Sequence, residues 1–395
     1  MIIIYVCIHQ QFWLIIPAEI NTRTTTPAKT PEKFSIRKLL FPYDYKKDHF
    51  KALDGLRGLA VLLVVLSHAS LHKVYIFPGA DFSGMGKPGV FLFFVLSAYL
   101  LDRQIIVGFV NGKANAKFWA NYFLRRFMRI FPLYLIALLV FYGCFKMGVK
   151  ASWIQDIPTI WRHLTLQQGL GIFWSIAVEF KYYFISPLIM AFCNYVLKWN
   201  LKKVTAFLVA LMIVSIYLQA KYKYDEITLI RYLPVFLVGT LISIYEVLLG
   251  KKRDLKVFKS KSFEYAGWFC SLLIIISIPS LYSYLFLNEG QKYPLSDSIF
   301  YLPYAIIWSV ILLAAKYGSV HILKRFFEIT AIRFLGIVSF SIYLFHVLIL
   351  NFVEMRKLHI PNFIQFYVFI LLASITSFLS YVLIERNLQK IRIKY

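Results

Sequence analysis

The chain has 395 residues, of which 59% are hydrophobic, 18% are aromatic and only 16% are charged. Because charged residues make up about a quarter of a soluble domain, this composition excludes an ordinary soluble protein and indicates a polytopic membrane protein with the lipid bilayer as a partner. The formal net charge of +25 would suggest nucleic-acid binding in a soluble chain, but the basic residues lie between apolar segments, as in cytoplasmic loops, so we expect no nucleic-acid partner.

The first fifty residues are predicted to lie outside the main membrane unit. Residues 1–16 are apolar but shorter than the about 20 residues that a spanning helix needs, so an extra span there stays open. Residues 17–50 are polar, contain proline and end in basic residues, which favours a flexible cytoplasmic arm. We therefore divide the chain into an N-terminal apolar segment plus arm, residues 1–50, and a transmembrane domain, residues 51–395.

Ten apolar segments follow, and they predict an all-α fold, a polytopic transmembrane helical bundle of about ten spans. Basic residues gather in every second connection, for example Arg103 after the second span and Lys316 and Arg333 between the eighth and the ninth. By the positive-inside rule, both ends of the ten-span unit are expected to be cytoplasmic. The predicted spans are residues 54–73, 88–107, 127–146, 173–197, 204–220, 229–249, 264–287, 298–316, 334–353 and 363–384.

The first span carries two ionisable residues, Arg57 near its start and His68 near its end. Eleven helical steps of about 100° return to within roughly 20° of the same direction and rise by roughly 16 Å, so both side chains share one face of the helix. Ionisable groups inside a membrane helix are costly and therefore indicate function. The structural alternative is a histidine that donates to a neighbouring carbonyl and an arginine that reaches lipid phosphate.

The start of the third span carries an arginine cluster, Arg125, Arg126 and Arg129. Arg125 and Arg129 are one helical turn apart and share a face. The cluster either sets membrane topology by touching lipid phosphates or binds a polyphosphate ligand, because guanidinium groups pair with phosphate oxygens in a two-pronged geometry.

Two later spans carry further candidates. Glu179 lies within the aromatic fourth span, where a carboxylate either pairs with a cation or takes up a proton. In the ninth span Tyr343 and His346 are three residues apart and share a helix face. Ordinary hydrogen bonding between helices is the alternative account of that pair.

Together these segments resemble the membrane acyltransferase-3 family. The matching marks lie in order along residues 52–387: LDGLRG with the Arg57–His68 spacing, GVFLFFVLSAYLL, RRFMRIFPLY, FWSIAVEFKYYFISP, FSIYLFH and the closing IERN. Three positions depart from the family's usual pattern, since Ala98 stands in place of Gly, Phe180 in place of a second acidic residue, and Asn387 in place of Pro.

The resemblance implies an integral membrane O-acetyltransferase in the bacterial inner (plasma) membrane. Its donor would be acyl-CoA, with acetyl-CoA expected, and its acceptor a hydroxyl of a cell-surface or exported carbohydrate or lipid-linked glycan. No metal is expected. The acceptor sugar and its hydroxyl, the acyl chain, the oligomeric state, and the choice between covalent and direct transfer are not specified by the sequence.

The resemblance and the residue chemistry together give each candidate an expected role. His68 would be the general base, which Glu179 would orient or stabilise when protonated. Arg57 would act with the arginine cluster, Arg125, Arg126 and Arg129, to hold the CoA phosphates. Tyr343 and His346 would serve in acyl relay or contact the acceptor.

The main alternative is a proton-coupled transporter or flippase of a sugar-containing substrate. In that protein His68 and Glu179 would form a proton relay. Such folds often contain matching inverted halves, and we find no matching halves in this sequence.

Overall fold

The structure is a computed structural model that describes residues 41, 44, 50–149, 152–251, 255–288, 293–295, 300–355, 361–388 and 391. The chain divides into two units, Met1–Pro42 and Tyr43–Tyr395, and the fold described below is that of the second. The predicted N-terminal apolar segment and arm, residues 1–50, lie outside the described residues apart from positions 41, 44 and 50.

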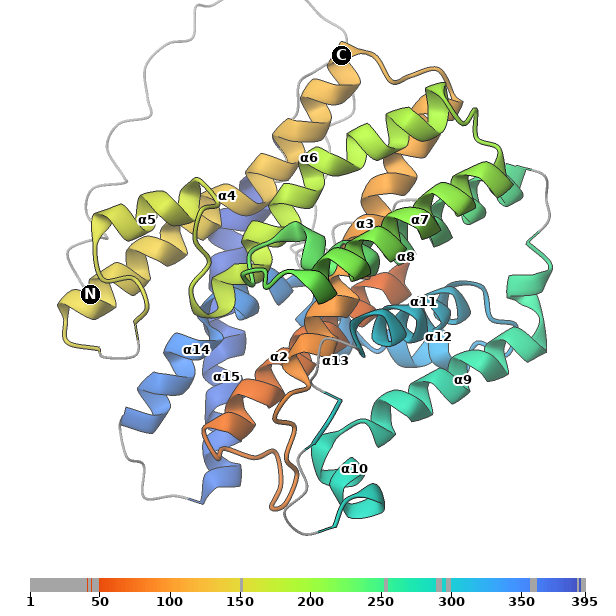
Figure 1. The fold of residues 1–395 in the computed structure, drawn as a ribbon. Coiled ribbons are helices and arrows are strands. Elements are labelled where there is room, and N and C mark those ends of the chain that lie inside the picture. The colour runs from red at the N-terminus through yellow and green to blue at the C-terminus, as the bar shows by residue number, and fades with distance from the viewer. Residues whose placement is uncertain are drawn as a thin grey trace, which may run out of the picture. The chain divides into compact units, whose positions relative to one another are not determined.

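The described part of the second unit is helical and has no strand, which confirms the all-α prediction (Figure 1). Seven of its helices are long and apolar enough to cross a membrane. They are α2 (Lys51–Leu71), α3 (Gly86–Val110), α4 (Ala116–Lys146), α6 (Trp174–Tyr195), α7 (Leu201–Lys221), α8 (Leu229–Lys251) and α15 (Asn362–Ser380).

Three predicted spans differ from straight crossings. The segment 264–287 is a pair of helices, α9 (Lys261–Ile276) and α10 (Pro279–Phe286), with an 85° bend. Pro279 causes the break, because it lacks an N–H and forces the preceding residue into an extended conformation. The segment 334–353 is α13 (Thr330–Ile337) and α14 (Ser339–Met355), bent by 80°. The segment 298–316 is α11 (Tyr301–Tyr317), whose 17 residues fall short of a full crossing.

The remaining described elements are short, and α4 begins earlier than predicted. The side chain of Asn115 accepts a hydrogen bond from the backbone N–H of Phe118 at 2.9 Å and so caps the helix. The helix begins at Ala116, eleven residues ahead of the predicted start. The short elements are α5 (Ile157–Leu164), η1 (Gly171–Phe173), η2 (Val257–Lys259), α12 (Ile322–Phe327), the π-helix η4 (Tyr381–Glu385) and α16 (Arg386–Leu388).

Three basic residues that we assigned to connecting loops lie instead within helices. Arg103 is in α3, Lys316 is in the last turn of α11, and Arg333 is in α13. Lys316 and Arg333 are buried. They therefore serve as ion-pair partners inside the bundle and are poor markers of membrane topology.

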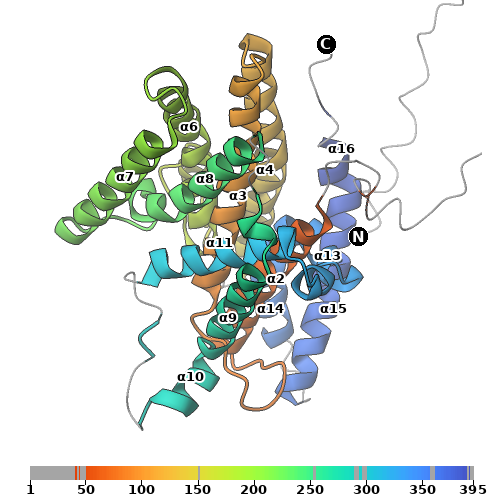
Figure 2. The ribbon, with the colours of Figure 1, turned by 90° about the vertical axis from the view of Figure 1, so that its right-hand side faces the viewer.

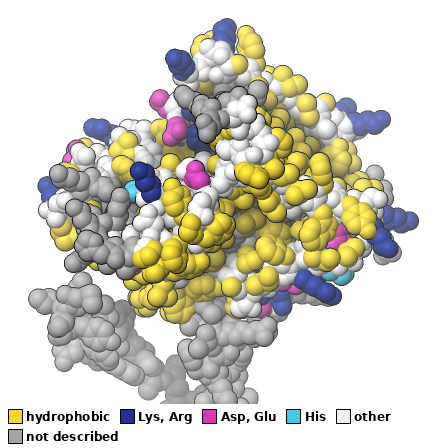
Figure 3. Space-filling view, turned by 90° about the horizontal axis from the view of Figure 1, so that it is seen from below, with side chains coloured by type: hydrophobic (Ala, Val, Ile, Leu, Met, Phe, Trp, Pro, Cys, Tyr) yellow, Lys and Arg dark blue, Asp and Glu magenta, His cyan; other side chains and the backbone are white. Residues whose placement is uncertain are grey.

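The helices differ greatly in how much of them the protein itself covers. We compared the most apolar stretch of each helix. In α2, 78% of that stretch is buried within the protein, whereas the share is only 22% in α7 and 28% in α15. In Figure 2, α2 and α3 lie inside the bundle, with α7 and α15 on opposite sides. Hydrophobic side chains cover much of the face shown in Figure 3, and such an exposed apolar surface suits contact with lipid.

A close glycine contact fixes α2 against α13. A Cβ atom on Gly336 would lie 1.7 Å from the carbonyl oxygen of Asp54, and one on Gly58 would lie 2.0 Å from that of Ile332. The two backbones can approach only because both residues lack side chains. The glycines of the LDGLRG motif thus have a packing role, and they set the position of Arg57.

Candidate active site

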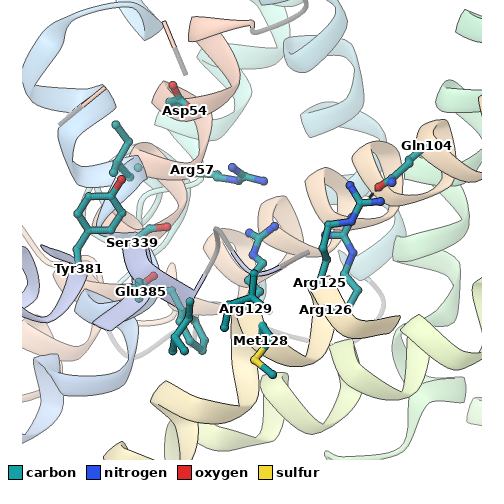
Figure 4. Close-up of a pocket in the computed structure, with 15 residues that line it drawn as sticks. Asp54, Arg57, Gln104, Arg125, Arg126, Met128, Arg129, Ser339, Tyr381 and Glu385 are labelled. Carbon is teal, nitrogen blue, oxygen red and sulfur yellow. Dashed lines mark hydrogen bonds between the residues drawn. The ribbon is translucent and has the colours of Figure 1, made fainter. Parts of the chain in front are cut away.

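Four arginines from two helices line one cavity of about 290 Å³, here called the arginine cavity (Figure 4). Arg57 comes from α2, whereas Arg125, Arg126 and Arg129 come from α4. The structure thus brings together arginines that lie on separate spans and that we predicted to bind the CoA phosphates jointly. Other lining residues include Asp54, Gln104, Ser339, Tyr381 and Glu385.

Two of these arginines have no direct ion-pair partner among the described residues. Among the described residues, no hydrogen bond or ion pair is found for the guanidinium groups of Arg57 and Arg129. Arg126 instead donates to Gln104 Oε1 at 3.3 Å and lies 5.7 Å from the ring centre of Tyr183. Because a partly buried cation without an ion pair is costly, a concave site lined by two of them favours an anionic ligand.

The acidic residues in this cavity are already bonded to the protein. The Asp54 carboxylate lies 3.4 Å from the guanidinium of Arg333. Glu385, in the π-helix, accepts a hydrogen bond from the hydroxyl of Ser341. The cavity therefore keeps an excess of positive charge, which suits phosphate groups better than a neutral ligand.

A narrow central cavity of about 60 Å³ adjoins the arginine cavity and shares Arg57, Arg129, Ser339 and Phe340 with it. Glu179 lines this central cavity. Its carboxylate accepts hydrogen bonds from the hydroxyls of Ser97 and Tyr183, the latter at 2.6 Å. Glu179 is thus held by hydroxyl groups from α3 and from its own helix.

Tyr343 lies at the boundary between the central cavity and a third cavity, since it lines both. Its hydroxyl is 2.7 Å from the carbonyl oxygen of Ile172 and 2.7 Å from Ser175 Oγ. A carbonyl only accepts, so Tyr343 donates to Ile172 and accepts from Ser175. Both hydrogen-bonding roles of the hydroxyl are occupied, so the side chain is held in place where the two cavities adjoin.

The third cavity, here called the histidine cavity, has a volume of about 430 Å³. His68 lines it together with the aromatic side chains of Trp153 and Trp174. An ion pair at 3.9 Å between Lys87 and Glu226 also lies in its lining. Flat aromatic surfaces with a few charged groups suit a polar organic ligand such as a sugar.

His68 forms a hydrogen-bonded pair with His346, at 2.9 Å between His68 Nδ1 and His346 Nε2. On its other side, His346 Nδ1 lies 2.8 Å from the carbonyl oxygen of Tyr343 and 3.0 Å from that of Ile342. Carbonyls only accept, so in the neutral pair Nδ1 of His346 carries the proton and its Nε2 accepts from His68. Nε2 of His68 then has a free lone pair, as a general base requires.

The structure pairs His68 differently from our prediction. Its hydrogen-bond partner is His346, whereas Glu179 bonds to Ser97 and Tyr183. Sequence reasoning gave Ser97 no role, and its signal was a hydroxyl group within an otherwise apolar run. Among the described residues, no group of three or more His, Cys, Asp or Glu side chains could hold a metal ion.

Comparisons with known proteins identify the family to which the sequence is similar. A family model described as "Acyltransferase domain" matches residues 50–384. O-acetyltransferase OatA of Staphylococcus aureus (strain NCTC 8325 / PS 47) is 24% identical over 374 residues, which cover 88% of this chain and 58% of that protein. Peptidoglycan O-acetyltransferase OatA of Listeria monocytogenes is 24% identical over 341 residues, which cover 76% of this chain and 49% of that protein.

The chain spans about half the length of the curated relatives it matches. No solved structure matches it.

Proposed function

The chain belongs to the acyltransferase family whose model spans residues 50–384, and on that premise we propose that it is an integral membrane O-acetyltransferase. Its donor is acetyl-CoA and its acceptor is a hydroxyl group of a carbohydrate outside the cytoplasm. The name of the Listeria relative makes peptidoglycan the first acceptor to test. One observation carries the proposal: adjoining cavities lead from unpaired arginines to a histidine pair.

The arginine cavity binds the phosphates of the donor. Within the part of the chain that the structure describes, Arg57 and Arg129 have no direct ion pair, and phosphate oxygens would give them charge-assisted hydrogen bonds. We place this end of the bundle at the cytoplasm of a bacterial inner membrane, because the basic connections point there under the positive-inside rule and acyl-CoA is a cytoplasmic metabolite. The thioester end then extends through the central cavity toward His68.

Direct transfer begins with removal of a proton from the acceptor. The Nε2 lone pair of His68 takes the proton of the acceptor hydroxyl as its oxygen attacks the thioester carbonyl, and the carbonyl π electrons move to oxygen. His346 accepts a hydrogen bond from His68 Nδ1, which orients the base and stabilises the imidazolium that forms. Arg57, which also lines the central cavity, supplies positive charge for the developing oxyanion.

The tetrahedral intermediate then collapses. The carbon–sulfur bond breaks, the CoA thiolate leaves, and the proton on His68 Nε2 neutralises the thiolate. The products are the acetyl ester and CoA. Glu179, held by hydrogen bonds from Ser97 and Tyr183, lines the central cavity through which the thioester passes.

The test is to measure ester-linked acetate on surface glycans, by mass spectrometry and proton NMR, in cells with and without the gene. We expect acetate esters to disappear without the protein and to return with the wild-type chain but not with His68→Gln. If the acetate content is unchanged and the amount of exported glycan falls instead, the transferase proposal is wrong and the transporter alternative gains support.

A further inference from the structure

A second, smaller cavity lies beside the arginine cavity and has no role in the mechanism above. Its volume is about 120 Å³, and it shares Asp54 and Arg57 with the arginine cavity. We call it the lysine cavity. Its other lining residues come from the start of α2, from α3 and from the end of α11: Phe50, Leu53, Tyr99, Leu100, Arg103 and Lys316.

Two cations in this cavity share one carboxylate. Lys316 Nζ lies 2.8 Å from Glu246 Oε1, and Arg103 Nε lies 3.1 Å from the same oxygen. The Lys316 side chain is only 1% exposed, so its charge is not dispersed by water. The trio carries a net charge of +1. On the shared wall Arg57 adds one positive charge and Asp54 one negative charge, and Asp54 is already paired with Arg333. A site with this balance attracts a compact anion.

The surroundings of Lys316 suit a phosphate attached to a nucleoside. Its Nζ also donates to the hydroxyl of Tyr99 at 2.6 Å and lies 3.9 Å from the ring centre of Phe50. Phe50 is 38% exposed, which leaves aromatic surface at the rim of the cavity. An ammonium group with rotatable donors binds a phosphate monoester as a point charge, beside an aromatic surface on which a base can stack.

The order of the cavities decides which phosphate goes where. In CoA the pantetheine arm is attached to the pyrophosphate, and a phosphate monoester sits on the ribose beyond it. The central cavity shares four residues with the arginine cavity, but only Arg57 of these lines the lysine cavity. If the thioester lies in the central cavity, the pyrophosphate must lie in the arginine cavity. The phosphate monoester, which is farther from the thioester along the CoA molecule, then reaches the lysine cavity.

We propose that the lysine cavity is the subsite for the ribose 3′-phosphate of the CoA donor, with Lys316 and Arg103 as its binding residues. This inference rests on the proposed function, because it assumes acetyl-CoA as the donor. It assigns to the enzyme a preference for CoA over its 3′-dephospho form. The structural alternative is that the trio only ties α3, α8 and α11 together.

The test compares the affinity of the purified full-length chain for CoA and for 3′-dephospho-CoA, by isothermal titration calorimetry in detergent. We expect the wild-type chain to bind CoA about tenfold or more tightly than 3′-dephospho-CoA. The dephospho form lacks the phosphate that would make charge-assisted hydrogen bonds to Lys316 and Arg103. Arg103→Gln should weaken CoA binding and leave 3′-dephospho-CoA binding nearly unchanged. Lys113→Gln is the matched control, because Lys113 is exposed and lies just beyond the end of α3, the helix that carries Arg103. This variant should keep the wild-type preference for CoA over 3′-dephospho-CoA.

The outcomes separate the subsite from the donor proposal. If the wild-type chain binds neither compound, the donor assignment fails and the subsite fails with it. If it binds both equally, or if Arg103→Gln weakens both by the same factor, the subsite is refuted while CoA remains the donor. Lys316→Gln is the second variant, and a correctly folded preparation should show the same selective loss. Arg103, whose side chain is 39% exposed, keeps the test decisive if the buried Lys316 variant does not fold.

Discussion

Replacing His68 by glutamine tests the proposed base directly. Glutamine keeps a side-chain N–H that can still donate to His346, but its amide does not take up a proton near neutral pH. The variant should therefore insert and bind acetyl-CoA normally while it loses turnover. A histidine with only a structural role would tolerate this change, because hydrogen bonding is largely kept.

The size of the expected loss follows from the geometry of the histidine pair. General-base catalysis contributes about 10²–10⁴-fold, which corresponds to about 2.7–5.4 kcal/mol in the activation free energy. His346→Gln removes no base and weakens one orienting hydrogen bond, which is worth about 1 kcal/mol or roughly a fivefold to tenfold loss. The two substitutions should thus differ in kcat by an order of magnitude or more, with similar KM values for acetyl-CoA.

The assay is release of the CoA thiol from acetyl-CoA in the presence of glycan acceptor, with CoA affinity measured by calorimetry as the folding control. Near-normal turnover in a His68→Gln protein that inserts and binds CoA would remove His68 from the mechanism and make Glu179 the next candidate base. An equal loss in the two histidine variants would instead mean that the pair acts as one unit, against the assignment of separate roles.

Three further predictions follow from the arrangement of the helices. Arg129→Ala should raise the acetyl-CoA KM about ten- to a hundredfold, with partial recovery in Arg129→Lys; a wild-type KM would make the arginine cluster a topology signal only. Gly336→Ala should lower the melting temperature of the detergent-purified protein, because the added Cβ atom would lie 1.7 Å from a backbone oxygen. Gly143→Ala is the control, since no atom lies within 4 Å of the Cβ position there, and it should be neutral or slightly stabilising. Equal melting temperatures for the two variants would refute the close contact. In a cysteine-free background, a membrane-impermeant maleimide should label Phe77→Cys from outside intact cells and leave Lys256→Cys unlabelled, and the reverse pattern would overturn the proposed orientation.

The sequence predicted what depends on local helix geometry. The Arg57–His68 spacing placed both residues on one helix, and the apolar runs placed most spans within a few residues. The partner of His68 was not predictable in this way. It depends on the 80° bend between α13 and α14 and on the Gly58–Gly336 contact, and neither leaves a periodic signal in the sequence.

The lysine cavity was missed for a related reason. Lys316 ends an apolar run, so it resembled a loop residue, and Glu246 lies seventy residues away in the chain. Spans that are apolar on nearly every face carry little information about which helix packs against which. Ion pairs between such spans therefore emerge only when the helices are assembled.

The sizes of the central cavity and the histidine cavity also bear on what moves during the proposed reaction. The central cavity, at about 60 Å³, has room for about two water molecules at roughly 30 Å³ each. An acetyl group fits that space, whereas a sugar ring does not. The histidine cavity, at about 430 Å³, is large enough for a sugar unit in contact with Trp153 and Trp174. Under the proposed function, these volumes fit an acetyl group that passes through the central cavity and a carbohydrate that remains in the histidine cavity. A transferase requires this arrangement, whereas a flippase must let the whole sugar pass.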